Sequence, residues 1–122
     1  MTEFALVQPE IPQNIGSALR TCACFGIPLH LVGPFSFLWD PQKFKRVVMD
    51  YEQLVDYKVH PDYSSFLDSL PSEKVLIGTT PAISATPYRE VSYTASSVVL
   101  FGSESTGLPS SVLSACHATA RI

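Results

Sequence analysis

The first segment with residues suited to chemistry contains Asn14, Gly16 and Arg20. Asn14 and Gly16 stand where a predicted helix over residues 15–25 begins, and backbone amides at a helix start can hold an anion such as a phosphate. Arg20 lies about 1.7 helical turns after Asn14, so the two side chains point in different directions on an ideal helix. An asparagine that caps the helix and an arginine on its surface would give the same pattern, and this alternative stays open.

The second such segment follows the strongly apolar run over residues 97–101 and contains Gly102, Glu104 and Gly107. Glycines at these positions allow the backbone to approach a ligand closely and to adopt left-handed conformations. A loop of this kind at the end of a buried strand therefore predicts a binding site. Glu104 could instead be a carboxylate that caps the helix expected after the loop.

A third segment ends another apolar run at Gly78 and Thr79. A glycine at a strand end leaves backbone groups open to a ligand, because it has no side chain to cover them. A simple strand end followed by a threonine turn explains the same residues equally well. This segment indicates a binding site only when it is considered together with the other two.

Short apolar runs alternate with helical stretches, and this alternation predicts the fold. Strands are expected at residues 4–7, 29–32, 54–59, 74–79 and 97–101, and from residue 118. Helices are expected at residues 15–25, 41–48, 61–70 and 108–116. Asn14 is predicted to cap the first helix and Gly26 to end it. Strands separated by helices imply right-handed crossovers, and hence an α/β fold with a mainly parallel sheet and helices on both faces.

Three polar loops of this predicted fold follow strands directly, at residues 8–14, 79–88 and 102–107. In open parallel sheets, ligands bind beyond the carboxyl ends of the strands. We therefore expect the three loops to converge on one site. The GxGxxG pattern of dinucleotide-binding proteins and the GxxxxGK[ST] pattern of NTP hydrolases are both absent from the sequence, so neither activity has a motif here.

Composition favours one ordered domain over residues 1–122, because 46% of the residues are hydrophobic and 16% are charged. No apolar run approaches the ~18–20 residues of a membrane span, and the N-terminus resembles no signal peptide. A cytoplasmic protein without a membrane partner is therefore expected. The scattered histidines and cysteines, three of each, do not have the paired spacing of a zinc site, so no metal is expected.

Charge restricts the way in which this chain could bind nucleic acid. The formal net charge is −3, which argues against a protein that coats nucleic acid through a generally basic surface. A local basic patch remains compatible with RNA binding. Lys43, Lys45 and Arg46 form such a cluster in the sequence.

Taken together, the segments resemble the SpoU-type RNA 2′-O-ribose methyltransferases of the SPOUT superfamily. Asn14, Gly16 and Arg20 match the N-x-G…R element of motif 1 in that family. The G-x-E-x-x-G-L element of motif 2 is matched from Gly102 to Leu108. Three further stretches resemble the small, single-domain TrmL subgroup: PEIPQNIGSALRTCACFG, FLWDPQKFKRVVMDY and LFGSESTGLP. The resemblance runs from residue 4 to residue 122.

The resemblance implies a function and a fold. Enzymes of this subgroup form homodimers and transfer a methyl group from S-adenosylmethionine (SAM) to the ribose 2′-hydroxyl of the wobble nucleotide, position 34, of tRNA. They have a SPOUT-type α/β fold with a C-terminal trefoil knot. By the same resemblance, this chain stops before the motif 3 segment, so the knot would be incomplete. A truncated, inactive relic that binds RNA or dimerises is the alternative function.

The resemblance also implies roles for individual residues. Arg20 would be the catalytic residue. Because an arginine side chain stays protonated, its expected role is to stabilise the developing alkoxide and hold the adjacent phosphate. The residues expected to bind RNA are Asn14 and Arg20 of motif 1, together with the basic cluster of Lys43, Lys45 and Arg46 that the charge pattern indicates. The residues expected to bind SAM are Gly78, Thr79, Gly102, Glu104, Gly107 and Ile122.

Overall fold

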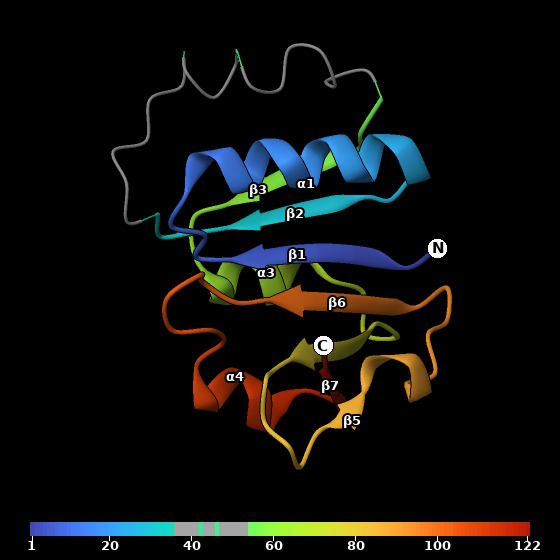
Figure 1. The fold of residues 1–122 in the computed structure, drawn as a ribbon. Helices are drawn as coiled ribbons and strands as arrows, with labels where there is room; N and C mark the ends of the chain where they lie inside the picture. Colours follow the sequence, from blue (N-terminus) through green and yellow to red (C-terminus); the bar gives the residue numbers. More distant parts are fainter. Residues whose placement is uncertain (36–41, 43–45, 47–53) are drawn as a thin grey trace.

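A computed structural model describes residues 1–35, 42, 46 and 54–122, and their strands form one seven-stranded sheet (Figure 1). The strands are β1 (Glu3–Val7), β2 (Leu29–Val32), β3 (Tyr57–His60), β4 (Val75–Thr79), β5 (Thr86–Pro87), β6 (Ser97–Phe101) and β7 (Ala118–Arg121). The helices are α1 (Pro12–Phe25), α3 (Tyr63–Ser69) and α4 (Ser110–Ala115), with a 3₁₀ turn at Tyr88–Glu90. The helix predicted at residues 41–48 lies outside the described residues, except for Gln42 and Arg46.

The sheet has the order β3-β2-β1-β6-β4-β7-β5, and all of its neighbouring pairs are parallel. Side chains alternate between its two faces, as the period of a strand requires. In β1, Phe4 and Leu6 pack with α1 on one face, whereas Ala5 and Val7 pack with α3 and α4 on the other. The prediction of a parallel sheet with helices on both faces is confirmed.

The start of α1 differs from the prediction. The helix begins at Pro12, its N-cap is Ile11, and no side chain of the cap residue bonds to the helix. Asn14 is therefore inside the helix, and its prediction as the N-cap is wrong. Pro12 is tolerated at the first position because the backbone N–H that it lacks would have no partner within the helix. Gly26 ends the helix in a left-handed conformation with φ of 66°, as predicted.

The predicted loop at residues 79–88 is interrupted by a short strand, β5. The two residues of β5 pair with β7, which is far away in the sequence. The third strand also lies later than predicted, at Tyr57–His60 instead of residues 54–59. Local apolar patterns do not reveal such positions, because the partner strand determines where a short strand begins.

The order of the strands determines where a site can form. The chain adds β2 and then β3 on one side of β1, and then crosses to the other side, where β6 and β4 lie. This reversal falls between β1 and β6, and the loops that leave the carboxyl ends of such strands diverge and leave a crevice. No helix in the described part of the chain is long and apolar enough to cross a membrane.

A buried polar network lies under α3, at the face of the sheet opposite α1. His30 Nδ1 is 3.0 Å from His60 Nε2, and His30 Nε2 is 2.9 Å from a Glu3 carboxylate oxygen. The second Glu3 oxygen is 2.7 Å from Lys74 Nζ, and both imidazole rings contact Phe66. Burial lowers the pKa of His60, and the neighbouring His30 adds to this effect. Burial opposes ionisation of Glu3, but hydrogen bonds from Lys74 and His30 outweigh it and lower the pKa of Glu3.

The network predicts loss of stability in acid. A histidine whose pKa is lowered by folding takes up its proton first in the unfolded chain, so stability falls as pH drops below about 6.5. The glutamate contributes stability above its unfolded pKa, near 4.5, and loses it at still lower pH. We expect the Tm, followed by circular dichroism, to fall between pH 7 and pH 5. The Tm of His60→Gln should fall less over this interval than the Tm of the unchanged protein. Equal falls in the Tm of both proteins would contradict the assignment to His60.

Candidate functional site

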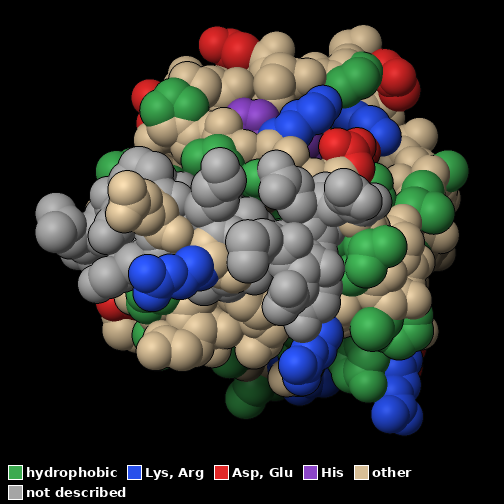
Figure 2. All heavy atoms as spheres, turned by 90° about the horizontal axis from the view of Figure 1, so that it is seen from above, with side chains coloured by type: hydrophobic (Ala, Val, Ile, Leu, Met, Phe, Trp, Pro, Cys, Tyr) green, Lys and Arg blue, Asp and Glu red, His purple; other side chains and the backbone are tan. Residues whose placement is uncertain are grey.

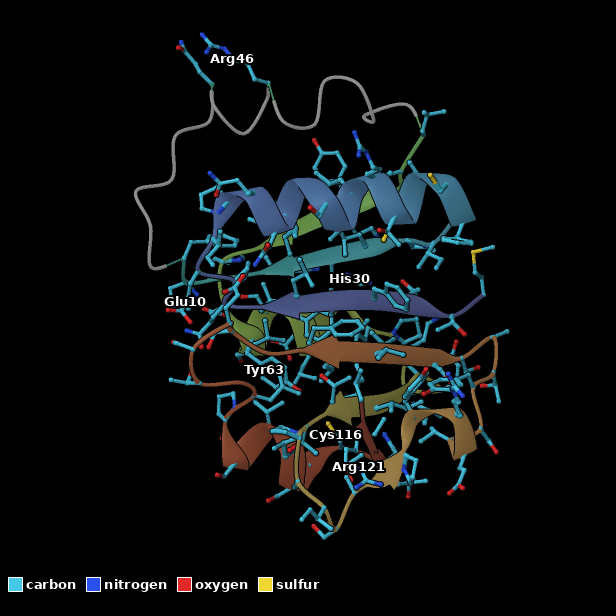
Figure 3. All side chains as sticks on the ribbon, viewed as in Figure 1. Glu10, His30, Arg46, Tyr63, Cys116 and Arg121 are labelled. Atoms are coloured by element: carbon cyan, nitrogen blue, oxygen red, sulfur yellow. The ribbon has the colours of Figure 1, made fainter. Side chains whose placement is uncertain are left out.

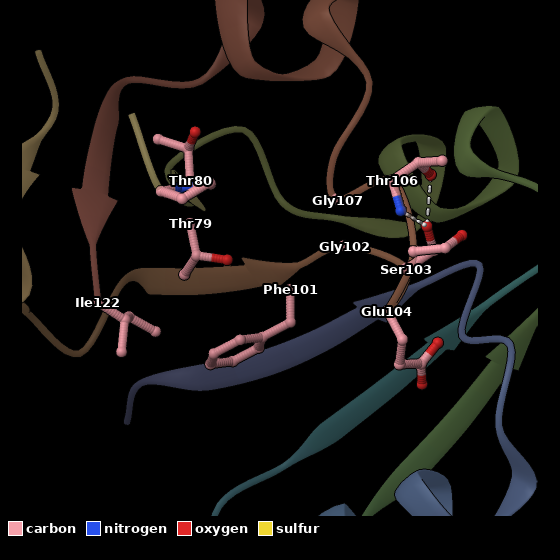
Figure 4. Close-up of a pocket in the computed structure, with 11 residues that line it drawn as sticks. Thr79, Thr80, Phe101, Gly102, Ser103, Glu104, Thr106, Gly107 and Ile122 are labelled. Atoms are coloured by element: carbon pink, nitrogen blue, oxygen red, sulfur yellow. Dashed lines mark hydrogen bonds between the residues drawn. The ribbon is translucent and has the colours of Figure 1, made fainter. Parts of the chain in front are cut away.

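A cavity of about 470 Å³ lies at the carboxyl ends of β4, β6 and β7 (Figure 4). Its lining consists of Thr79, Thr80, Pro81, Phe101, Gly102, Ser103, Glu104, Ser105, Thr106, Gly107 and Ile122. The predicted loops at residues 79–88 and 102–107 therefore meet, and the segment after β7 completes the wall. Pockets of this size are typical of small-molecule sites.

The loop from Gly102 to Gly107 folds back on itself beside the cavity. The Gly107 N–H donates to the Ser103 carbonyl at 2.9 Å, and Ser103 Oγ lies 2.6 Å from Thr106 Oγ1. A Cβ atom added to Gly102 would lie 2.1 Å from the Gly107 carbonyl carbon and 2.2 Å from the Leu108 nitrogen. Gly107 has φ of 70°, which favours glycine. Both glycines are therefore required by the shape of the loop.

The opposite wall is built from the ends of β4 and β7. Thr79 Oγ1 donates to the Leu100 carbonyl at 2.9 Å, and the Thr80 N–H donates to the Ala120 carbonyl at 2.9 Å. Gly78 is buried and is not among the lining residues. A Cβ atom on Gly78 would lie 2.9 Å from Leu113 and 3.0 Å from Cys116, so this glycine allows α4 to pack on β4.

An apolar hollow of about 350 Å³ adjoins the cavity on the face of the sheet that α1 partly covers. Its lining consists of Thr2, Phe4, Ile27, Thr79, Tyr88, Tyr93, Val99, Phe101, Ala120 and Ile122. Thr79, Phe101 and Ile122 line both spaces. The site therefore offers a polar loop and an apolar surface to the same ligand.

Glu104 joins this loop to the start of α1. Its carboxylate accepts hydrogen bonds from the Glu10 N–H at 2.7 Å and from Asn14 Nδ2 at 2.9 Å, and it points away from the cavity toward the β1–α1 connection (Figure 4). Desolvation opposes ionisation of Glu104, but the bonds from Asn14 and from the N–H groups of Glu10 and Ile11 outweigh it and lower its pKa. Glu104 thus does not cap the helix that follows its own loop. It bonds to the segment that leads into α1 and to the Asn14 side chain, some 90 residues earlier in the sequence.

Glu10 makes the reverse connection. Its Oε1 atom accepts hydrogen bonds from the Ser105 N–H at 2.9 Å and from Ser105 Oγ at 2.6 Å. These bonds from Ser105 lower the pKa of the Glu10 carboxyl. Each loop therefore holds the other through a carboxylate, and we call this pair of contacts the reciprocal carboxylate link. It brings the third predicted loop, at residues 8–14, to the site.

The remaining predicted residues are not brought into the cavity. Arg20 lies at an exposed position of α1. Arg46 lies on the far side of α1 from the sheet (Figure 3). Lys43 and Lys45 lie outside the described residues. On this side of the molecule, described Lys and Arg side chains lie in separate groups with Asp and Glu among them (Figure 2).

Sequence reasoning missed several residues of the site. Glu10 stands between two prolines just before Asn14, and its position ahead of a helix start was the available signal. The other missed residues, which include Phe101 and Ser105, carry no motif of their own, because only the folded loop brings them to the cavity. Among the described residues, no group of three or more His, Cys, Asp or Glu side chains could hold a metal ion.

The cavity suits binding and positioning more than acid–base chemistry. Its lining combines hydroxyl groups, loop backbone and apolar side chains, and its one carboxylate is bonded to the neighbouring loop. Such a site can hold a ligand with polar and apolar parts at the edge of the sheet.

Comparison with known proteins agrees with this arrangement. The family model of the SpoU rRNA Methylase family matches residues 1–122. A tRNA (cytidine(34)-2'-O)-methyltransferase of Yersinia pestis is 41% identical, and the alignment covers 100% of this chain and 77% of that protein.

Two solved structures are also similar. One, described as "Structural insights into the 2-OH methylation of C/U34 on tRNA", has a TM-score of 0.88 at 38% identity and is matched over 79% of its chain. The other, an AdoMet-bound rRNA methyltransferase from Sinorhizobium meliloti, has a TM-score of 0.79 at 25% identity and is matched over 46% of its chain. They cover 100% and 99% of this chain, respectively. On its sequence, its fold and the loops of its site, the chain belongs to the SpoU rRNA methylase family.

Proposed function

We propose that the protein methylates the ribose 2′-hydroxyl of the wobble nucleotide, position 34, of tRNA, with SAM as the methyl donor. The observation that carries the proposal is the likeness, over 100% of this chain, to tRNA (cytidine(34)-2'-O)-methyltransferases at 41% and 36% identity. The site supports it, because the motif 2 loop lines a cavity with the polar and apolar surfaces that such a cofactor needs, and the same loop bonds to Asn14 of motif 1. Transfer of a labelled methyl group to C34 of tRNA tests it.

The cavity residues fit SAM. Gly102 and Gly107 leave the loop backbone bare at the cavity, and Thr79 and Ile122 form the wall opposite. Glu104 and Gly78 would support SAM binding indirectly. Glu104 holds the loop in place through the reciprocal carboxylate link, and Gly78 allows α4 to pack on β4. When bound, SAM supplies an electrophilic methyl group. The protein must then hold the ribose oxygen in line with that methyl, near ~3–3.5 Å.

Arg20 is the proposed catalytic residue. Asn14, which donates to Glu104, is proposed to hold the first turn of its helix against the motif 2 loop. A ribose hydroxyl is a poor nucleophile until its proton leaves. The protonated guanidinium of Arg20 would stabilise the developing alkoxide and grip the adjacent phosphate, while a phosphate oxygen or water takes the proton. Arg20 is exposed in the structure, so it is accessible to an RNA that docks against α1.

The proposed partners are tRNA and a second copy of this chain, in the cytoplasm, where tRNA is modified. Lys43, Lys45 and Arg46 are proposed to contact tRNA phosphates. The net charge of −3 requires such a local patch, because the average surface would repel RNA. No metal has a role in the proposed reaction.

Gly102→Ala should weaken SAM binding, because the new methyl group would clash with the backbone of Gly107 and Leu108. Overpacking of this kind costs about 1–3 kcal/mol, so we expect a loss of affinity of roughly 5- to 150-fold by calorimetry. Gly26→Ala is the control. It places an alanine at positive φ, where Gly26 has nothing within 4 Å, and it lies far from the motif 2 loop in the sequence. It should leave the affinity for SAM unchanged.

Arg20→Ala should lower methyl transfer far more than SAM affinity, because Arg20 is assigned to the ribose and the phosphate. Loss of one group that stabilises transition-state charge lowers kcat by ~10²–10³-fold. Single-turnover assays with saturating tRNA measure this directly. A variant with the turnover of the unchanged protein would remove Arg20 from the mechanism.

Reversal of the three charges at Lys43, Lys45 and Arg46 should weaken tRNA binding and flatten its dependence on salt. Each phosphate contact that is lost lowers the salt slope by about 0.7–0.9. Fluorescence anisotropy at several salt concentrations measures the slope. An unchanged affinity and slope would show that tRNA docks elsewhere.

A further inference from the structure

A second hollow, of about 340 Å³, lies on another side of the loop that carries motif 2. Its lining consists of Gln8, Glu10, Pro34, Phe35, Ser103, Ser105 and Thr106. The last three residues also line the main cavity, so the two spaces share one loop as a wall. The rest of the hollow comes from the segments that follow β1 and β2, and Figure 3 places Glu10 at that end of the sheet.

The lining of this second hollow suits a flat, uncharged group that donates hydrogen bonds. It contains one aromatic ring, one amide, one carboxylate and three hydroxyl groups, and no Lys or Arg is among its residues. A phosphate would therefore be repelled by the Glu10 carboxylate. A nucleobase would be accepted, because bases that are turned out of an RNA loop stack on aromatic side chains and bond through their edges.

Two backbone features fix the polar and aromatic groups of this hollow. Gln8 has φ of 51°, and its N–H donates to the Val32 carbonyl at 2.7 Å. A glutamine in this conformation is uncommon, and such strained residues gather at functional sites. The Phe35 ring packs against Gly33, where an added Cβ atom would lie 3.2 Å from the ring. The glycine thus gives the ring its place at the end of β2.

We propose that this second hollow binds the base of the nucleotide whose ribose is methylated, and that Glu10 makes it prefer cytosine to uracil; the inference rests on the proposed function. The shared loop explains the geometry, because a base held on one side of residues 103–106 leaves its ribose beside the loop that bounds the main cavity. The charge explains the preference. Cytosine presents an amino group where uracil presents a carbonyl oxygen, and a carboxylate can only accept hydrogen bonds.

Glu10 can hold Ser105 and read a base at the same time. Both bonds from Ser105 end on the Oε1 atom. An ionised carboxylate offers about four acceptor positions on its two oxygens. The lowered pKa of Glu10 keeps it ionised at neutral pH, as the preference for an amino group requires.

The first test compares two anticodon stem–loop RNAs that differ only in C34 or U34. Transfer of labelled methyl from SAM gives kcat/KM for each RNA with the unchanged protein, with Glu10→Gln and with the control Glu73→Gln, which alters an exposed glutamate far along the chain. We expect Glu10→Gln to reduce the preference for C34 by roughly 5- to 150-fold, as for loss of a good base contact, because its amide can also donate to uracil. Glu73→Gln should keep the preference.

The ratio separates reading of the base from a structural role. If Glu10 served only to hold Ser105, Glu10→Gln would lower kcat/KM for both RNAs by the same factor. An unchanged ratio would therefore overturn the proposal.

The second test measures binding without catalysis. Anisotropy gives the Kd of the C34 RNA and of an RNA that lacks the base at position 34, for the unchanged protein, for Phe35→Leu and for Phe35→Tyr. We expect the base to strengthen binding by roughly 5- to 150-fold in the unchanged protein and in Phe35→Tyr, as stacking on an aromatic ring does. In Phe35→Leu the base at position 34 should strengthen RNA binding much less, while the Kd for SAM stays the same.

Failure of the inference and failure of the proposed function have different signatures. If the unchanged protein methylates C34 but Phe35→Leu keeps the full gain from the base, the second hollow does not bind the base. If the unchanged protein methylates neither RNA, or methylates another nucleotide, the proposed function is wrong and the inference falls with it.

Discussion

The reciprocal carboxylate link between Glu10 and Glu104 is the contact on which the site depends. Glu104, from the loop after β6, accepts hydrogen bonds from the Glu10 N–H and the Asn14 side chain at the start of α1. Glu10, from the loop before α1, accepts from Ser105 in return. Two negative groups lie close together here, yet both pKa values are lowered, because each carboxylate accepts bonds from N–H or O–H groups of the other loop. A helix start also favours negative charge nearby. The motif that holds the proposed cofactor and the helix that carries Arg20 are therefore fixed to each other.

Glycine at three positions makes this arrangement possible by allowing close approach. Gly102 lets the motif 2 loop fold flat against Gly107, and Gly78 lets α4 pack on β4. Gly33 lets the Phe35 ring lie against the end of β2. The loop at residues 102–107 consequently has a defined shape with a hollow on either side, one for the proposed cofactor and one for the proposed target base.

Much of the fold and part of the site follow from local patterns. Alternating apolar runs predict the parallel sheet and the helices on both faces, because each side of a buried strand must meet an apolar layer. The segments at Asn14–Arg20 and Gly102–Gly107 are recognisable because glycine and polar residues follow strands at short spacing. The convergence of their loops follows in turn from the strand order of an open parallel sheet.

The sequence by itself thus determined the fold class, the two motifs and the edge of the sheet where they meet. Only the tertiary structure decided which atoms bond there. Asn14 looks like a helix cap from its neighbours, but Pro12 starts the helix earlier and the Asn14 amide bonds to Glu104 instead. Glu10 has only its place ahead of a helix start as a local signal, and Phe35 has none, since the residues that share the hollow with them come from the distant loop at residues 103–106. A hydrogen bond between distant loops depends on the packing of the whole sheet, and short-range spacing does not contain that information.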